Sequence, residues 1–122
     1  MKKILQINSS ILGEQSASKI LSDHTVNALR NDGDIKLTIR DCLNIPHLDE
    51  QSLIAFSGQG SNISESHKNL LDLSDELISE LMEADTVVIG VPMYNFGIPS
   101  QLKSFFDFIC RVGITFKYTE SG

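Results

Sequence analysis

Short apolar runs alternate along the chain with longer stretches in which apolar residues recur at helical spacing. The runs at residues 3–8 and 86–91 lack a helical period and predict strands buried in a parallel sheet. Residues 35–40 alternate apolar and polar side chains, which predicts a strand that is more exposed on one face. The pattern therefore predicts three strands.

Three helices are predicted around these strands. Helical spacing starts at Ser16 and stops at the glycine of "NDGD", where helices commonly end. Residues 70–82 carry a clear apolar stripe, and residues 99–112 form the last predicted helix. The stretch from residue 41 to about residue 66 contains a proline and two glycines and predicts irregular structure.

Strands separated by helices imply a parallel sheet with helices on its faces, an α/β doubly wound fold. The length of 122 residues suits a single domain. The helix predicted at 99–112 is apolar on more than one stripe, whereas a helix that packs only on its own sheet needs one. We expect the second stripe to meet a partner subunit or further chain.

Composition narrows the class of function. Hydrophobic residues make up 41% of the chain, and the net charge is −6 with acids and bases interspersed. A nucleic-acid partner is not expected, because it requires a basic face. Cys42 and Cys110 lack metal-ligand spacing and are interpreted as reduced structural residues, with no metal site. We find neither a signal-peptide pattern nor a membrane-spanning run and expect a cytoplasmic protein.

The candidate chemistry lies in the loops after the first and third strands, where doubly wound sheets bind ligands. The first loop has no dinucleotide or P-loop fingerprint but is rich in serine hydroxyls. Ser16 and Ser18 lie at a helix start, where free N–H groups and the helix dipole favour an anion. This pattern suits a phosphate monoester, although Ser16 as a simple helix cap is an open alternative.

The second loop places Met93, Tyr94 and Phe96 on a strand-to-helix turn, where short polar connections are usual. Such residues often belong to a core, so this loop alone decides little. Taken together, the two loops predict a ligand with a phosphate at one end and a flat ring at the other. Flavin mononucleotide (FMN) fits that description.

Four segments carry a resemblance to a known family: "SSILGEQSAS", "LSDELI", "PMYNF" and "QLKSFFDFICRVGITFKYTESG". Together they resemble the FMN-dependent NADH:azoreductase family. The resemblance implies a flavodoxin-like fold with strand order 2-1-3-4-5. It also implies reduction of quinones and azo compounds with NADH, and a homodimer in which the partner completes each active site.

The resemblance also implies the residues that hold FMN. The phosphate is expected at Ser10, Ser16, Ala17 and Ser18, and the ring and ribityl chain along Met93, Tyr94, Asn95 and Phe96. The implied mechanism is ping-pong: NADH reduces the flavin and leaves, and the acceptor then takes two electrons. The flavin carries this chemistry, so no catalytic side chain is expected. A backbone N–H of the 93–96 turn, that of Asn95, is expected to face flavin N5.

Three alternatives remain open from the residues alone. One is a quinone reductase that uses FAD, although the serine hydroxyls of the first loop suit a terminal monophosphate better. Another is a flavodoxin-like electron carrier without substrate turnover of its own, although carriers of that type enclose the flavin. The third is a phosphoacceptor signalling domain, which needs carboxylates after the first strand, where only Glu14 is present.

Family chains continue past "YTESG", so residues 1–122 are expected to be one FMN-binding domain that is incomplete at its C-terminus, without the last two strands and a glycine-rich flavin-contacting segment. We predict that residues 1–122 alone form neither a stable monomer nor a competent FMN holder, because "TVVIGV" would present an unpaired apolar edge. Size-exclusion chromatography and a thermal melt check this. A soluble yellow monomer that melts cooperatively would contradict it.

Overall fold

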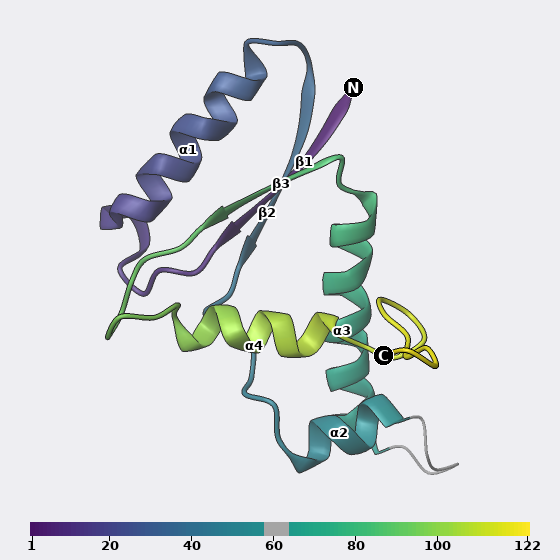
Figure 1. The fold of residues 1–122 in the computed structure, drawn as a ribbon. Helices are drawn as coiled ribbons and strands as arrows, with labels where there is room; N and C mark the ends of the chain where they lie inside the picture. The colour runs from purple at the N-terminus through teal and green to yellow at the C-terminus, as the bar shows by residue number, and fades with distance from the viewer. Residues whose placement is uncertain (58–63) are drawn as a thin grey trace.

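A computed structural model describes residues 1–57 and 64–122 (Figure 1). Its elements follow the predicted alternation of strands and helices, with a short 3₁₀ turn at Gly13–Gln15 and one additional helix. In chain order they are β1 (Lys2–Asn8), α1 (Ala17–Arg30), β2 (Ile35–Asp41), α2 (Glu50–Ser57), α3 (Glu65–Glu83), β3 (Thr86–Gly90) and α4 (Ser100–Ile109).

The additional helix, α2, lies in the segment that the sequence predicts to be irregular. It follows Asp49, whose carboxylate accepts hydrogen bonds from the backbone N–H and the hydroxyl of Ser52, both at 2.9 Å. These bonds lower the pKa of Asp49. Asp at this position is a helix-start signal that the prediction did not use, because it was based on the nearby proline and glycines. The part of the predicted loop at 58–63 lies outside the described residues.

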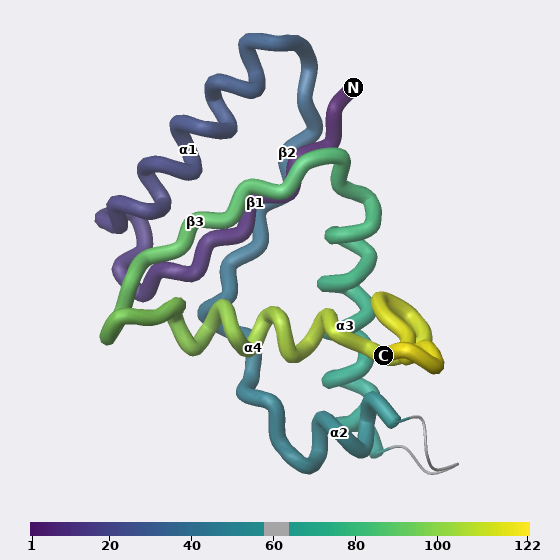
Figure 2. Tube along the Cα trace, viewed as in Figure 1, coloured from purple at the N-terminus to yellow at the C-terminus, as the bar shows by residue number. Residues whose placement is uncertain are grey.

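The sheet is parallel and has the order β2-β1-β3. Figure 2 shows β1 running between its two neighbours. In the register, Leu5 lies beside Thr38 on one side and Val87 on the other. This order confirms the first three strands of the flavodoxin-like prediction. Within the described residues β3 pairs with β1 alone, and its Val87 and Ile89 are 37% and 40% exposed.

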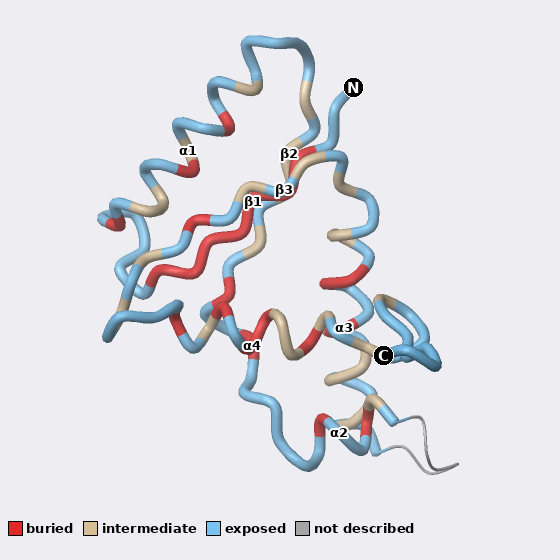
Figure 3. The backbone as a smooth tube through the Cα atoms, viewed as in Figure 1, coloured by how far each residue is buried: buried red, intermediate tan, exposed pale blue. Residues whose placement is uncertain are grey.

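The two faces of the sheet are covered differently. α1 packs on one face, and α3 and α4 lie on the other (Figure 1). Figure 3 shows β1 buried along most of its length, with further buried positions in α4. The apolar core lies on the α3/α4 face and consists of Leu5, Ile7, Cys42, Ile45, Leu77, Leu102, Phe105 and Phe108. Burial of each large side chain there stabilises the fold by about 1.5–3 kcal/mol.

The last helix ends earlier than the sequence predicts. α4 stops at Ile109, so Val112 lies beyond the helix and is 61% exposed. The second apolar stripe expected on this helix consists of Phe105, Phe108 and Val112, and of these Phe105 and Phe108 are 1% and 0% exposed and belong to the chain's own core. Most of that stripe is therefore used within the domain, and a partner at this helix remains a prediction.

Both cysteines are free thiols. Cys42 lies in the core, where burial raises the pKa of its thiol to about 11. This confirms its structural role. Cys110 is exposed just after α4, so its interpretation as a structural residue is wrong. Among the described residues, no helix combines the length and the apolar character that a membrane span requires.

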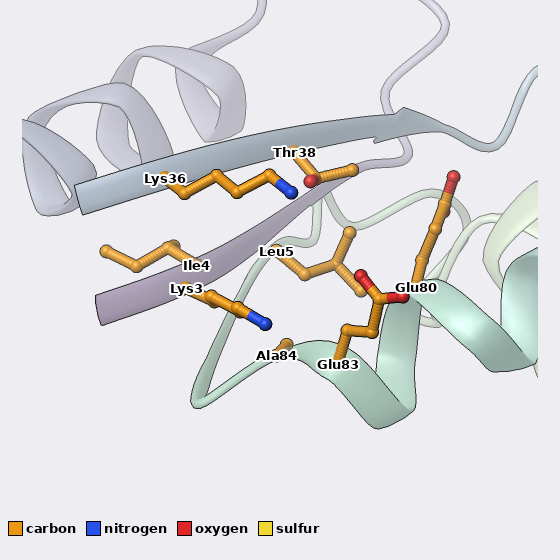
Figure 4. Close-up of a pocket in the computed structure, with 8 residues that line it drawn as sticks. All are labelled: Lys3, Ile4, Leu5, Lys36, Thr38, Glu80, Glu83 and Ala84. Carbon is orange, nitrogen blue, oxygen red and sulfur yellow. The ribbon is translucent and has the colours of Figure 1, made fainter. Parts of the chain in front are cut away.

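A small cavity lies between β1, β2 and the last turn of α3, lined in part by Lys3, Lys36 and Glu83 (Figure 4). Its volume of about 40 Å³ accommodates water but no nucleotide. Lys3 is the second residue of β1, so the cavity lies toward the amino ends of the strands. Ligands of this fold bind at the opposite end.

Gly90, at the end of β3, allows α1 to approach the sheet closely. A Cβ at position 90 would lie 3.0 Å from the carbonyl oxygen of Ser18 and 3.3 Å from the hydroxyl of Ser22. We predict that Gly90→Ala lowers the free energy of unfolding by about 1–3 kcal/mol, because the backbone of α1 has to shift. Gly97→Ala is the matched control, since its nearest neighbour, the Tyr94 carbonyl oxygen, is 4.0 Å away. Equal denaturation midpoints for the two variants would contradict the prediction.

Candidate functional site

The loops after β1 and β3 meet at the carboxyl edge of the sheet, beside the start of α1 (Figure 1). They are joined directly, because the Ser9 hydroxyl donates a buried hydrogen bond of 2.7 Å to the carbonyl of Gly90. Ser10 follows in the first loop and is 6% exposed. The two predicted loops therefore form one site at the position where open α/β sheets bind ligands.

Ser16 is the N-cap of α1. It has an extended backbone, and its hydroxyl accepts a hydrogen bond from the Lys19 N–H at 3.3 Å. Its own N–H donates to the carbonyl of Gly13 at 3.0 Å, where a φ of 59° closes the loop. The simple capping role that the sequence left open is therefore real. The Ser16 side chain is buried, at 2% exposure, and its hydroxyl lies 2.8 Å from that of the half-buried Ser18.

The start of α1 has unused hydrogen-bond donors. The first N–H groups of a helix have no acceptor within it, and Ser16 accepts only that of Lys19. Within residues 1–57 and 64–122, the N–H groups of Ala17 and Ser18 have no acceptor. The Lys19 ammonium is held by Asp23 at 2.9 Å and Glu14 at 3.3 Å, which raises its pKa. The helix start therefore offers an anion neutral donors and the helix dipole.

The second loop contains a strained turn. Tyr94 and Gly97 exchange two backbone hydrogen bonds of 3.0 Å, and the residues between them, Asn95 and Phe96, have φ values of 50° and 66°. Asparagine tolerates this left-handed conformation, whereas a bulky residue such as phenylalanine rarely adopts it. Strain of this kind costs about 1–3 kcal/mol per residue and concentrates at functional sites.

This turn also displays apolar side chains to solvent. Phe96 is 96% exposed, Met93 71% and Ile98 47%. Met93 and Ile98 belong to an open groove next to the first loop, which is lined by Ile11, Met93, Tyr94, Asn95, Ile98, Ser100 and Gln101. An apolar surface around a strained turn is suited to a flat ring.

The Tyr94 hydroxyl connects the two loops. It lies 3.2 Å from the Ser10 hydroxyl and accepts a hydrogen bond from the Ile11 N–H at 3.1 Å. The Leu12 N–H in turn donates to the Ser10 hydroxyl at 3.1 Å. The serine-rich loop and the aromatic turn are thereby fixed relative to each other.

The structure brings Ser10 into contact with Tyr94 and places Ser16 and Ser18 together at the helix start. Sequence reasoning missed the groove residues Ile11, Ile98, Ser100 and Gln101. For Ile11 a signal was available, because Ile11 and Leu12 are an apolar pair inside the otherwise polar segment "SSILGEQSAS".

Comparison with known proteins places this geometry in context. A family model described as "Flavodoxin-like fold" matches residues 2–122. Curated relatives include FMN-dependent NADH:quinone oxidoreductases from Shewanella denitrificans and Photorhabdus laumondii, which are 46% and 43% identical over 100% of this chain. The chain spans 62% of the length of each of these relatives.

Solved structures with a similar fold include azoreductases. An azoreductase from Bacillus anthracis matches with a TM-score of 0.86 at 26% identity, covering 100% of this chain and 62% of that one. An FMN-dependent NADH-azoreductase from the same species, in complex with FMN, matches with a TM-score of 0.83 at 29% identity, covering 100% of this chain and 61% of that one. These likenesses agree with the resemblance carried by the four sequence segments. The family match over nearly all of its residues means that the chain belongs to the flavodoxin-like fold family.

Proposed function

We propose that this protein is an FMN-dependent oxidoreductase that transfers two electrons from NADH to quinones and azo compounds. The observation that carries the proposal is the pair of contacts from the Tyr94 hydroxyl to Ser10 and Ile11. They hold the serine-rich loop, which leads to uncharged donors suited to an anion, beside the exposed aromatic turn. The names of the relatives support it, since they describe FMN-dependent quinone and azo reductases.

The residues at the helix start fit a terminal phosphate. The free N–H groups of Ala17 and Ser18 and the hydroxyls of Ser16 and Ser18 would bind its oxygens. Ser10 contributes as well: where Tyr94 donates to the Ser10 oxygen, which also accepts from Leu12, the Ser10 hydrogen is free for the ligand. Neutral donors at one helix start suit a monophosphate, which favours FMN over FAD.

The second loop fits the ring end. Tyr94 and Gly97 use their N–H groups within the turn, whereas the N–H groups of Asn95 and Phe96 have no acceptor in the described part of the chain. They are the donors available to polar atoms of the ring. Met93 and Phe96 would cover its apolar parts.

When bound, FMN would supply the hydride and electron-transfer chemistry, so the task of this chain is to bind and orient FMN, NADH and the acceptor. The Tyr94 and Phe96 side chains would form the surface against which NADH and then the acceptor lie in turn, which is the arrangement that ping-pong exchange requires. The exposure of Phe96 also favours an enzyme over a carrier that encloses its flavin. We further propose a homodimer, in which a second copy of the chain covers part of this exposed surface.

The test of this function is purification of the intact protein, followed by its absorption spectrum and its NADH consumption with a soluble quinone and with an azo dye. Flavin absorption together with NADH-dependent turnover is expected. A yellow protein that does not turn over either acceptor would favour the electron carrier, and a colourless protein that FMN does not bind would overturn the proposal.

We predict that Ser16→Ala/Ser18→Ala weakens FMN binding about tenfold or more, since each lost hydrogen bond contributes about 0.5–1.5 kcal/mol. Loss of the N-cap at Ser16 also costs about 1 kcal/mol of stability. Ser18→Ala alone keeps that cap and separates the two effects. Fluorescence titration with FMN measures affinity, and Ser79→Ala, an exposed serine of α3, is the control. Unchanged affinity would remove both serines from the site.

Tyr94→Phe tests the bridge between the loops. The phenylalanine keeps the ring but loses the contacts to Ser10 and Ile11, so the free energy of unfolding is expected to fall by about 1 kcal/mol or more. Tyr118→Phe is the matched control, because within the described residues its hydroxyl has no partner and its side chain is 75% exposed. Chemical denaturation of both variants gives the comparison, and a loss no larger than that of the control would rule out the bridge.

A further inference from the structure

The half of α1 that carries the proposed phosphate site lacks an apolar anchor. The only buried residues of this helix are Ser22 and Val26, and Val26 lies in its second half. The apolar residues of the first half, Ile20 and Leu21, are 49% and 67% exposed. Among the described residues, therefore, no buried apolar side chain of α1 fixes its first two turns on the sheet.

A polar side chain of the sheet occupies that position instead. Gln6 lies in the middle of the apolar strand β1 and is 1% exposed. Its amide nitrogen donates to the Asp23 carboxylate at 2.8 Å and to the Ser22 hydroxyl at 3.0 Å, and lies 3.3 Å from the Asn8 side-chain oxygen. Both Asp23 and Ser22 belong to α1, so one buried amide joins the central strand to two successive residues of the helix.

This contact selects one position of the helix. A buried amide is costly unless its hydrogen bonds are made, and hydrogen bonds require a defined distance and direction. The Ser22 hydroxyl is also 3.3 Å from the Asn8 side-chain oxygen, which is a second polar contact between this helix and β1. Apolar contacts alone would tolerate sliding of α1 along the sheet, whereas the Gln6 contacts do not.

The same contacts lead to the helix start. Asp23 also accepts from the Lys19 ammonium at 2.9 Å, and the Lys19 N–H donates to the Ser16 hydroxyl. The hydrogen bond from Gln6, followed by that from Lys19, lowers the pKa of Asp23 and so keeps its acceptor oxygens ionised. Hydrogen bonds therefore link Gln6 to Asp23, Asp23 to the Lys19 side chain, and the Lys19 backbone to Ser16.

We propose that Gln6 is a positioning residue for phosphate recognition: through Asp23, Ser22 and Lys19 it holds the first turns of α1 so that the donors at residues 16–18 face the phosphate of the flavin. This inference rests on the proposed function. It assigns to a buried strand residue, 10 positions away from Ser16 in the sequence, an effect on the phosphate end of the ligand alone.

The experiment compares FMN with riboflavin, which has the same ring but no phosphate. In the intact protein Gln6→Met keeps the length of the side chain and removes its hydrogen bonds. We expect FMN affinity to fall about fivefold or more, while riboflavin affinity changes less than about twofold. The matched control is Ser74→Ala, which removes a buried hydrogen bond to the Phe108 carbonyl on the opposite face of the sheet. Its ratio of FMN to riboflavin affinity is expected to stay unchanged.

A second pair of variants covers the case in which Gln6→Met does not fold. Asp23→Ala in a Lys19→Met background is compared with Lys19→Met alone, so that no freed ammonium attracts the phosphate. Because the Lys19 contact is absent from both variants, the pair tests the direct hold of Gln6 on α1 through Asp23. Both side chains are partly exposed, at 44% and 21%, and their replacement leaves the core intact. The ratio of FMN to riboflavin affinity is again expected to fall.

The outcomes separate the two proposals. If the unmodified protein prefers FMN over riboflavin and the ratio is unchanged in these variants, or both affinities fall together, Gln6 only stabilises the fold and the positioning role is overturned. If the unmodified protein binds neither flavin, the proposed function fails and the role of Gln6 fails with it.

Discussion

The close approach of α1 to the end of β3 at Gly90 is the constraint on which the site depends. With a Cβ at that position, the carbonyl of Ser18 would be only 3.0 Å away, so a side chain there would push the helix start off the sheet. The Gly90 carbonyl also accepts a hydrogen bond from the Ser9 hydroxyl. One glycine thus brings together the end of β1, the end of β3 and the first turn of α1. These are the three parts from which the anion site and the aromatic turn are built.

One face of the sheet contributes most of the stability of the fold, and the other face fixes the position of α1. On the α3/α4 face, Leu5 and Ile7 pack into an apolar core, which supplies most of the burial energy but tolerates small shifts. On the α1 face, Gln6 and Ser22 form hydrogen bonds, which contribute less net energy but define direction. The helix that carries the ligand donors is therefore the one held by directional contacts. Alternation of side chains along β1 achieves both in a single strand.

Local pattern was sufficient for the strands and for the helix start at Ser16, because periodicity and capping are properties of neighbouring residues. The start of α3 at Ser64 was missed, since its apolar stripe begins only at residue 70. The prediction also failed at α2, because a proline and two glycines in the same segment indicate irregular structure and the cap at Asp49 was overlooked. That the loops after β1 and β3 meet could be predicted for a different reason, since the carboxyl ends of parallel strands share one edge. The Tyr94–Ser10 contact and the role of Gln6 depend on tertiary packing, which no local spacing encodes.

The aromatic turn shows why sequence rules fail at a site. Left-handed backbone at Phe96 opposes the local preference of phenylalanine, and its 96% exposure gives up about 1.5–3 kcal/mol of burial energy. The surrounding contacts hold this conformation: two hydrogen bonds close the Tyr94–Gly97 turn, and the Tyr94 hydroxyl is bound by the first loop. Neither the strain nor the exposure benefits the fold. A flat apolar group that covered Phe96 and accepted hydrogen bonds from the free N–H groups beside it would offset both costs, which is the role that the flavin has in the proposed function.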